Sequence, residues 1–170
     1  TSFIAPNIGY ESENISLDVA NGLKYKIDNK TSVYIKPKMH GLNNTSLSEY
    51  ENFSRENSAA IGVNTKYELL KGTNFNLSAE TEILGKYSGS ELDISVSQFI
   101  PPIALPLPLI ISAGTTIKDS KTANYYYGVK ETDLNNTFQS EYKMGVINNP
   151  YLGLSAFYEI SDNIDLFTNI

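Results

Sequence analysis

The residues whose spacing first suggests chemistry are two glutamates, Glu80 and Glu82. They lie two apart in a segment with a strand-like pattern, so both side chains point to one face, and glycoside hydrolysis uses paired carboxylates. Glycosidase carboxylates, however, face each other across a cleft from different segments. Several lysines fall on the same face here, so we predict ion pairs rather than a hydrolytic pair. The residues expected to face this polar interior, or lumen, are Lys24, Lys36, Lys66, Glu68, Glu80 and Glu82.

His40, the only histidine, lies at the end of a predicted strand, in the run Lys38-Met39-His40-Gly41. A catalytic interpretation would pair it with a serine nucleophile, but no sequence element fixes such a serine. Catalytic sites need several convergent groups. We therefore predict a histidine at the rim of the fold or in a loop.

Three consecutive tyrosines, Tyr125 to Tyr127, are flanked by Asp119, Glu131 and Asp133. The tyrosines suit either a ligand-stacking patch or an aromatic belt at a membrane surface. The belt is favoured because it shelters the ring while the hydroxyl stays hydrated. The acids suit a divalent cation, but their spacing matches no compact calcium loop. We predict solvated loop charges here, and neither a metal nor a cofactor.

Composition restricts the class of protein. The formal net charge is −6 and the 13 basic residues are scattered, so no basic stripe is available to follow a nucleic-acid backbone. The absence of cysteine excludes disulfides and thiolate chemistry. No apolar run reaches the roughly 18 residues of a transmembrane helix, and the amino-terminal segment lacks the pattern of a signal peptide. We expect residues 1–170 to form one domain.

The elements that position these residues are predicted to be strands. Apolar and polar residues alternate with period two in about nine segments, which is typical of strands with one apolar face. The first segment is 3–10, and the second is one long strand over 15–27. The others lie near 31–39, 61–69, 75–83, 92–96, 109–117, 152–160 and 164–166.

A soluble sandwich and a membrane barrel both fit this alternation. Several segments are longer than the five or six residues usual in soluble strands, and they reach the roughly 9 to 11 residues that a membrane strand requires. The polar face is also too rich in charged and amide side chains for a soluble core. We therefore predict an all-β fold, an antiparallel up-and-down transmembrane β-barrel. The residues expected to face lipid are Leu17, Val19, Tyr25, Ile61, Val63, Leu77, Leu154 and Ala156.

The predicted connectors alternate in length. Those at 28–30, 71–74 and 161–163 are short, whereas those at 40–57 and 119–150 are long and polar, which is typical of outer-membrane barrels. If successive connectors alternate between the two ends of the strands, 101–108 lies on the same side as the short connectors. The connectors 11–14 and 85–91 then lie on the same side as the long ones. Because bacterial barrels have even strand numbers, we expect the chain to be an incomplete part of a barrel of about ten to twelve strands.

The run Tyr125, Tyr126, Tyr127, Gly128 and Val129 resembles the YFGV-like box of the MipA/OmpV family of outer-membrane proteins. In that family the box precedes a long loop, a strand of the form GLGLSxxY, a tight turn and a strand containing LF. The same order occurs here at 151–158, 161–163 and 165–167. The chain departs from the family in having Ile164 where a tryptophan is usual.

The resemblance implies a non-enzymatic scaffold of the bacterial outer membrane, surrounded by lipid and lipopolysaccharide, that interacts with a murein lytic transglycosylase and a penicillin-binding synthase. The alternative is a small-solute channel, although a barrel of about ten strands has little open lumen. An outer-membrane hydrolase is the third hypothesis. A scaffold would bind murein enzymes at its short connectors, where Pro101, Pro102, Pro106 and Pro108 form a distinctive surface. The favoured interpretation of these prolines is simpler, that they end two strands and block edge pairing.

Overall fold

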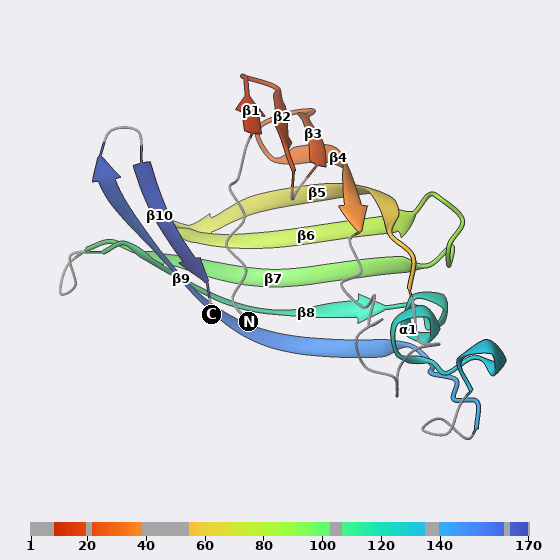
Figure 1. Cartoon of the computed structure of the whole chain (residues 1–170). Coiled ribbons are helices and arrows are strands. Elements are labelled where there is room, and N and C mark those ends of the chain that lie inside the picture. The colour runs from red at the N-terminus through yellow and green to blue at the C-terminus, as the bar shows by residue number, and fades with distance from the viewer. Residues whose placement is uncertain are drawn as a thin grey trace.

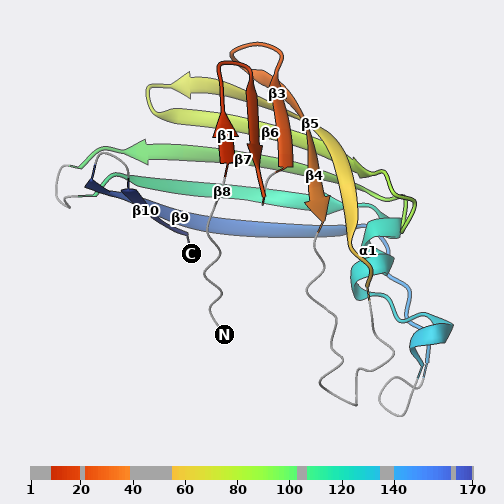
Figure 2. The ribbon, with the colours of Figure 1, turned by 45° about the horizontal axis from the view of Figure 1, so that its top comes forward.

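A computed structural model shows one antiparallel sheet of ten strands that follow one another in chain order. It describes residues 9–19, 22–38, 55–102, 107–134, 140–161 and 164–169, with side chains described as far as residue 156. The sheet curves strongly, with β1 and β10 as its two edges in the described residues (Figures 1 and 2). This confirms the predicted all-β, up-and-down fold in the form of an open sheet with the curvature of a partial barrel.

The strands differ greatly in length. The three amino-terminal ones are short, and those from β5 to β9 have 10 to 15 residues each. In chain order they are β1 (Gly9–Glu11), β2 (Ile15–Asp18), β3 (Gly22–Lys26), β4 (Thr31–Lys38), β5 (Ser58–Leu70), β6 (Thr73–Glu82), β7 (Ser90–Ile100), β8 (Leu109–Lys118), β9 (Ile147–Ser161) and β10 (Ile164–Asn169).

The prediction of one long strand over 15–27 is wrong. The structure divides this segment into β2 and β3, which pair with each other so that Ile15 lies opposite Tyr25 and Asp18 opposite Gly22. Gly22 has a φ of +73°, which glycine adopts without a Cβ penalty. The dipeptide Asn21-Gly22 is a common hairpin-turn signal, so the sequence did contain the information. This division makes ten strands out of about nine predicted segments.

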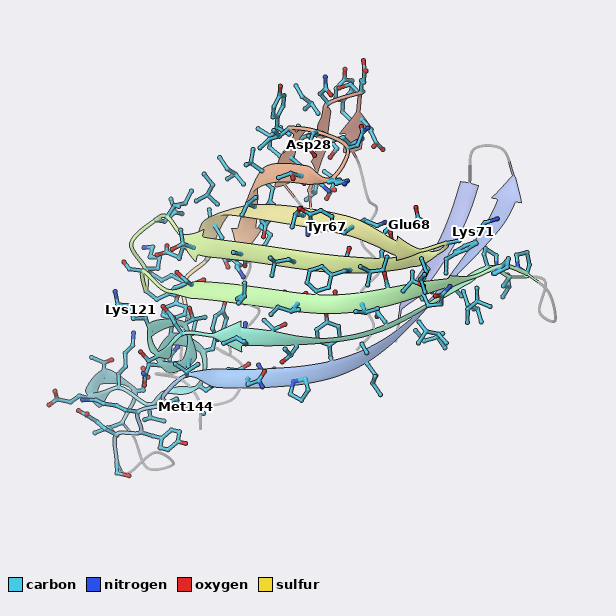
Figure 3. All side chains as sticks on the ribbon, turned by 180° about the vertical axis from the view of Figure 1, so that it is seen from behind. Asp28, Tyr67, Glu68, Lys71, Lys121 and Met144 are labelled. Atoms are coloured by element: carbon cyan, nitrogen blue, oxygen red, sulfur yellow. The ribbon has the colours of Figure 1, made fainter. Side chains whose placement is uncertain are left out.

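The two longest connections, 39–57 and 119–146, lie at the same end of the sheet, together with 19–21 and 83–89. We call this the long-connection end. The opposite, short-connection end carries 12–14, 27–30, 71–72, 101–108 and 162–163. The prediction that 11–14 lies on the long side is therefore wrong, because the β2–β3 turn reverses the chain once more. Figure 3 shows Lys121 and Met144 at the long-connection end and Lys71 at the other.

The strand registers confirm the predicted alternation of faces. Tyr25, Val33, Val63, Ala79 and Leu92 stand opposite one another in successive strands and belong to an apolar face. Much of this face is exposed, as at Ile61 and Val63, whose exposed fractions are 43% and 42%. The opposite, polar face carries the row Tyr34, Gly62, Glu80, Glu91 and Lys118.

The connection between β8 and β9 contains regular structure where the sequence predicted a polar loop. Helix α1 (Ser120–Tyr127) begins after Asp119, whose carboxylate accepts a hydrogen bond of 2.7 Å from the backbone N–H of Thr122. This is a standard helix N-cap. The short 3-10 helix η2 (Glu131–Asp133) follows. Among the described residues, no helix is long and apolar enough to cross a membrane.

Candidate functional site

Lysines and glutamates of the polar face form a continuous ion-pair row at the long-connection end. Glu80 and Glu91 lie directly opposite each other on β6 and β7, and like charges in that position repel. Lys38 relieves the repulsion by contacting both carboxylates, at 2.9 Å for Glu91. Lys36 pairs with Glu80 at 2.7 Å and Lys118 with Glu91 at 2.5 Å. Both glutamate side chains are about nine-tenths buried, so their charges depend on these lysines.

Tyr34 connects this row to the centre of the sheet. Its hydroxyl donates to Glu80 Oε2 over 2.8 Å and shares a hydrogen bond of 3.0 Å with the Ser78 hydroxyl. The ring lies across Gly62, where an added Cβ would come within 2.5 Å of it. Glycine at position 62 therefore leaves the space that the Tyr34 ring occupies.

Glu82 has a different role from the lysine pairing that we predicted. Its carboxylate accepts hydrogen bonds from the backbone N–H groups of Leu84, Lys86 and Ser88, at 2.8, 3.1 and 2.9 Å. The Ser58 hydroxyl also donates to it. Glu82 thus holds the 83–89 connection in shape, because converging backbone donors stabilise an anion.

Of the six predicted lumen-facing residues, the structure brings Lys36 and Glu80 together. Lys24 is half-buried, whereas Lys66 and Glu68 are exposed, and none of these three forms an ion pair with another described residue. The Glu68 carboxylate instead accepts a hydrogen bond of 3.0 Å from the backbone N–H of Gly72 in the β5–β6 turn.

A cluster of tyrosines lies next to the ion-pair row at the long-connection end. Tyr125 of α1 stacks on Tyr87 with ring centroids 4.5 Å apart, and Tyr126 meets Tyr87 edge-on at 5.9 Å. Lys118 Nζ lies 5.2 Å from the Tyr126 ring centroid. Tyr125 is buried, and its hydroxyl donates to the backbone carbonyl of Glu56. The aromatic-belt prediction is therefore wrong for Tyr125, although Tyr127 is exposed.

Arg55 fixes this cluster to the rest of the long-connection end. It is the only arginine of the chain, and its Nη2 lies 3.0 Å from Asp133 Oδ2 and donates to the carbonyl of Gly128 over 2.9 Å. Its Nε donates to the carbonyl of Tyr125. Both charged side chains are buried, so the prediction of a solvated loop charge is wrong for Asp133.

The environment of Asp133 sets its protonation state. Burial raises the pKa of this carboxyl, but hydrogen bonds from Arg55 and from the backbone N–H of Lys130, together with the Arg55 charge, outweigh it and hold the pKa below its usual value. Burial also raises the pKa of the Tyr87 and Tyr125 hydroxyls. These hydroxyls are therefore protonated at neutral pH, and Asp133 is ionised.

A cavity of about 450 Å³ opens beside α1. Its walls come from the 83–89 connection, from α1 and the residues after it, and from the segment that precedes β9. Tyr87 and Tyr125 contribute aromatic surface, and four lysines and two glutamates surround it: Lys86, Lys121, Lys130, Lys143, Glu131 and Glu141. The cavity thus combines aromatic rings with an excess of positive charge.

The remaining predicted site residues lie elsewhere. Pro101 and Pro102 are exposed at the short-connection end, and Pro108 is half-buried. Pro106 and His40 lie outside the described residues. No group of three or more metal-ligating side chains was found in the described part of the chain.

Sequence reasoning missed most of this site. It placed Lys38 near the end of a predicted strand but did not include it in the ion pairs, and it singled out none of Arg55, Tyr87, Glu91 and Lys118. For Arg55 a signal existed, because one arginine among 12 lysines suggests a position that requires a planar, multidentate donor. Tyr87 carried no such signal, since its partners lie far away in sequence.

Comparisons with known proteins give one result. Searches of the curated proteins and of the solved structures find no match. A family model described as "MltA-interacting protein MipA" matches residues 1–170, the whole chain. The chain therefore belongs to the MipA family.

Proposed function

We propose that this protein is a non-enzymatic outer-membrane barrel that acts as a scaffold for murein-remodelling enzymes of the bacterial envelope. The observation that carries the proposal is the match of the whole chain to a family described as MltA-interacting. MltA is a murein lytic transglycosylase, and a penicillin-binding synthase would be the second client. A scaffold of this kind brings an enzyme that cuts the wall near one that extends it.

The two faces of the sheet support a membrane location. Strands β6, β7 and β8 have 10, 11 and 10 residues, enough to cross the hydrocarbon layer when tilted. A hollow of about 690 Å³ lies over Ile61, Val63, Ala79 and Leu92 of the apolar face. Lipid chains would fill it, whereas in water this exposed apolar area would favour aggregation.

The ion-pair row supports a non-enzymatic role. A hydrolase requires a carboxylate or another base that is directed at its substrate. Here Glu80 and Glu91 are neutralised by Lys36, Lys38 and Lys118, and Glu82 is bound by backbone donors. These acids stabilise the sheet and its connections.

We place the enzyme-binding surface at the short-connection end, which faces the periplasm in outer-membrane barrels. Leu70 is 73% exposed there, and Pro101 and Pro102 are exposed in another connection of the same end. An exposed leucine with rigid prolines forms a surface that loses little conformational entropy on binding. Lipopolysaccharide would surround the opposite end.

Affinity purification from cross-linked envelopes tests the scaffold. We expect Leu70→Ser combined with Pro101→Ser and Pro102→Ser to reduce recovery of the lytic transglycosylase at least several-fold. Leu84→Ser is the matched control, because Leu84 is 57% exposed at the long-connection end. Undiminished recovery with the first variant would exclude this surface. Recovery of no murein enzyme with the unchanged protein, together with large steady conductance in planar bilayers, would favour the channel.

A further inference from the structure

The cavity beside α1 has no part in the proposed scaffold, because it lies at the opposite end of the sheet from the proposed docking surface. We infer that this cavity binds a phosphorylated saccharide. Its volume of about 450 Å³ falls within the range of small-ligand sites, roughly 300 to 1,000 Å³. Inorganic phosphate alone would leave most of that space unfilled.

The positive charge around the cavity calls for an anionic ligand. Four of its lining residues are lysines and two are glutamates, although the whole chain has a net charge of −6. Lys86 is paired with Glu56 at 2.6 Å and Lys143 lies 3.8 Å from Glu141. Lys121 and Lys130 form no ion pair within the described residues. Lysine acts as a point-charge donor to phosphate, so these two amines fit a phosphate group.

The remaining walls suit the sugar. Tyr142 is 54% exposed and lines the cavity together with the partly exposed Tyr87, while the buried Tyr125 supports Tyr87 by stacking on its ring. Aromatic rings with a polar hydroxyl accommodate ligands that have both apolar and polar surfaces, and a pyranose has an apolar face and a rim of hydroxyls. The carboxylates of Glu131 and Glu141 can accept hydrogen bonds from those hydroxyls.

The walls are held in place before any ligand arrives. The Asn124 side chain donates to the Met144 carbonyl over 2.6 Å and accepts from the Met144 N–H over 2.7 Å. Val129 and Tyr142 form two backbone hydrogen bonds with each other, of 2.9 and 3.0 Å. Since the cavity is already ordered, binding does not have to supply the conformational entropy of forming it.

Such a ligand has two sources, a soluble sugar phosphate or the phosphate-bearing sugars of lipopolysaccharide. The test uses the protein purified in detergent and isothermal titration with glucose 6-phosphate, glucose and inorganic phosphate. A second arm uses lipopolysaccharide micelles before and after enzymatic dephosphorylation. We expect glucose 6-phosphate or phosphorylated lipopolysaccharide to bind, and to bind more weakly as salt increases. Binding to lipopolysaccharide alone would assign the membrane-anchored source.

The variant Lys121→Gln with Lys130→Gln should lower the affinity about tenfold or more, because it removes two charged donors. The control, Lys66→Gln with Lys71→Gln, changes the net charge equally near the other end of the sheet and should leave the affinity unchanged. Circular dichroism confirms that both variants are folded. The inference is overturned if both variants lose affinity equally, if glucose, inorganic phosphate or dephosphorylated lipopolysaccharide binds as tightly as the phosphorylated ligand that binds, or if neither phosphorylated ligand binds.

Discussion

Arg55 and Asp133 form a buried ion pair, 3.0 Å between Nη2 and Oδ2, although 78 residues separate them in the chain. Arg55 comes just before β5 and Asp133 ends η2, so the pair joins the two longest connections of the molecule. The same guanidinium also binds the carbonyls of Tyr125 and Gly128. One side chain thus orders the approach to β5 and the segment that follows α1.

Removing one partner of this pair should destabilise the long-connection end. Asp133→Asn leaves the Arg55 charge buried without its carboxylate, and loss of one partner from a buried pair costs on the order of 3 to 5 kcal/mol. We expect a clear drop in the urea midpoint of the refolded protein in micelles. Glu141→Gln is the control, since the exposed Glu141–Lys143 pair at 3.8 Å should contribute less than about 1 kcal/mol. Equal effects of the two substitutions would contradict the importance of the buried pair.

Acid should release the same contact. The pKa of Asp133 is lower in the folded protein than its usual value, so its contribution to stability is complete above that usual value, about 3.9, and is lost as pH falls through the folded pKa. Because Arg55 is the only arginine, its Nε–H gives a single identifiable NMR resonance. We expect this resonance to be protected from pH 7 down to about pH 4 and to be lost only as the pH falls further, below the usual carboxyl pKa. Loss already near pH 6 would contradict ionic pairing with Asp133.

Lys38 should matter far more than Lys66, an exposed lysine of the same face near the other end of the sheet. Lys38→Met leaves Glu80 and Glu91 opposite each other with one lysine fewer, and a disrupted buried pair costs on the order of 3 to 5 kcal/mol. Lys66→Met, at an exposed position, should change the free energy of unfolding by less than about 0.5 kcal/mol. Urea titrations of both variants in micelles measure the difference. Similar stabilities would show that the ion-pair row contributes little.

The alternation of apolar and polar residues predicted most of the fold, because each strand of a two-faced sheet repeats the same two-residue period. Leu77 and Glu80 lie on the predicted faces for this reason. The turn at Gly22 was missed although its dipeptide was visible, because the alternation continued across it. The Arg55–Asp133 pair and the Tyr87–Tyr125 stack could not be predicted from the sequence. They depend on where two long connections meet, and no periodic pattern encodes such a meeting.

The assignment of faces yields the last prediction, which also tests the membrane location. Val63 and Asn64 are neighbours on β5, and the register places Val63 opposite Val33 and Ala79, and Asn64 opposite Ser32 and Ser78. An arginine on the lipid face near the middle of the bilayer costs on the order of 2 to 4 kcal/mol. Val63→Arg should therefore reduce assembly into lipid vesicles strongly.

Asn64→Arg puts the same charge on the polar face, beside a hollow lined by Lys24, Tyr34 and Ser78, where water can hydrate it. We expect assembly close to that of the unchanged protein, measured as the folded fraction in vesicles after dilution from urea. Equal folding of both variants in vesicles would show that the apolar face does not contact lipid. A folding defect of Val63→Arg that is equally large in vesicles and in detergent-free buffer would mean that the arginine disrupts packing within the protein. Contact between Val63 and lipid would then not be needed to explain the defect.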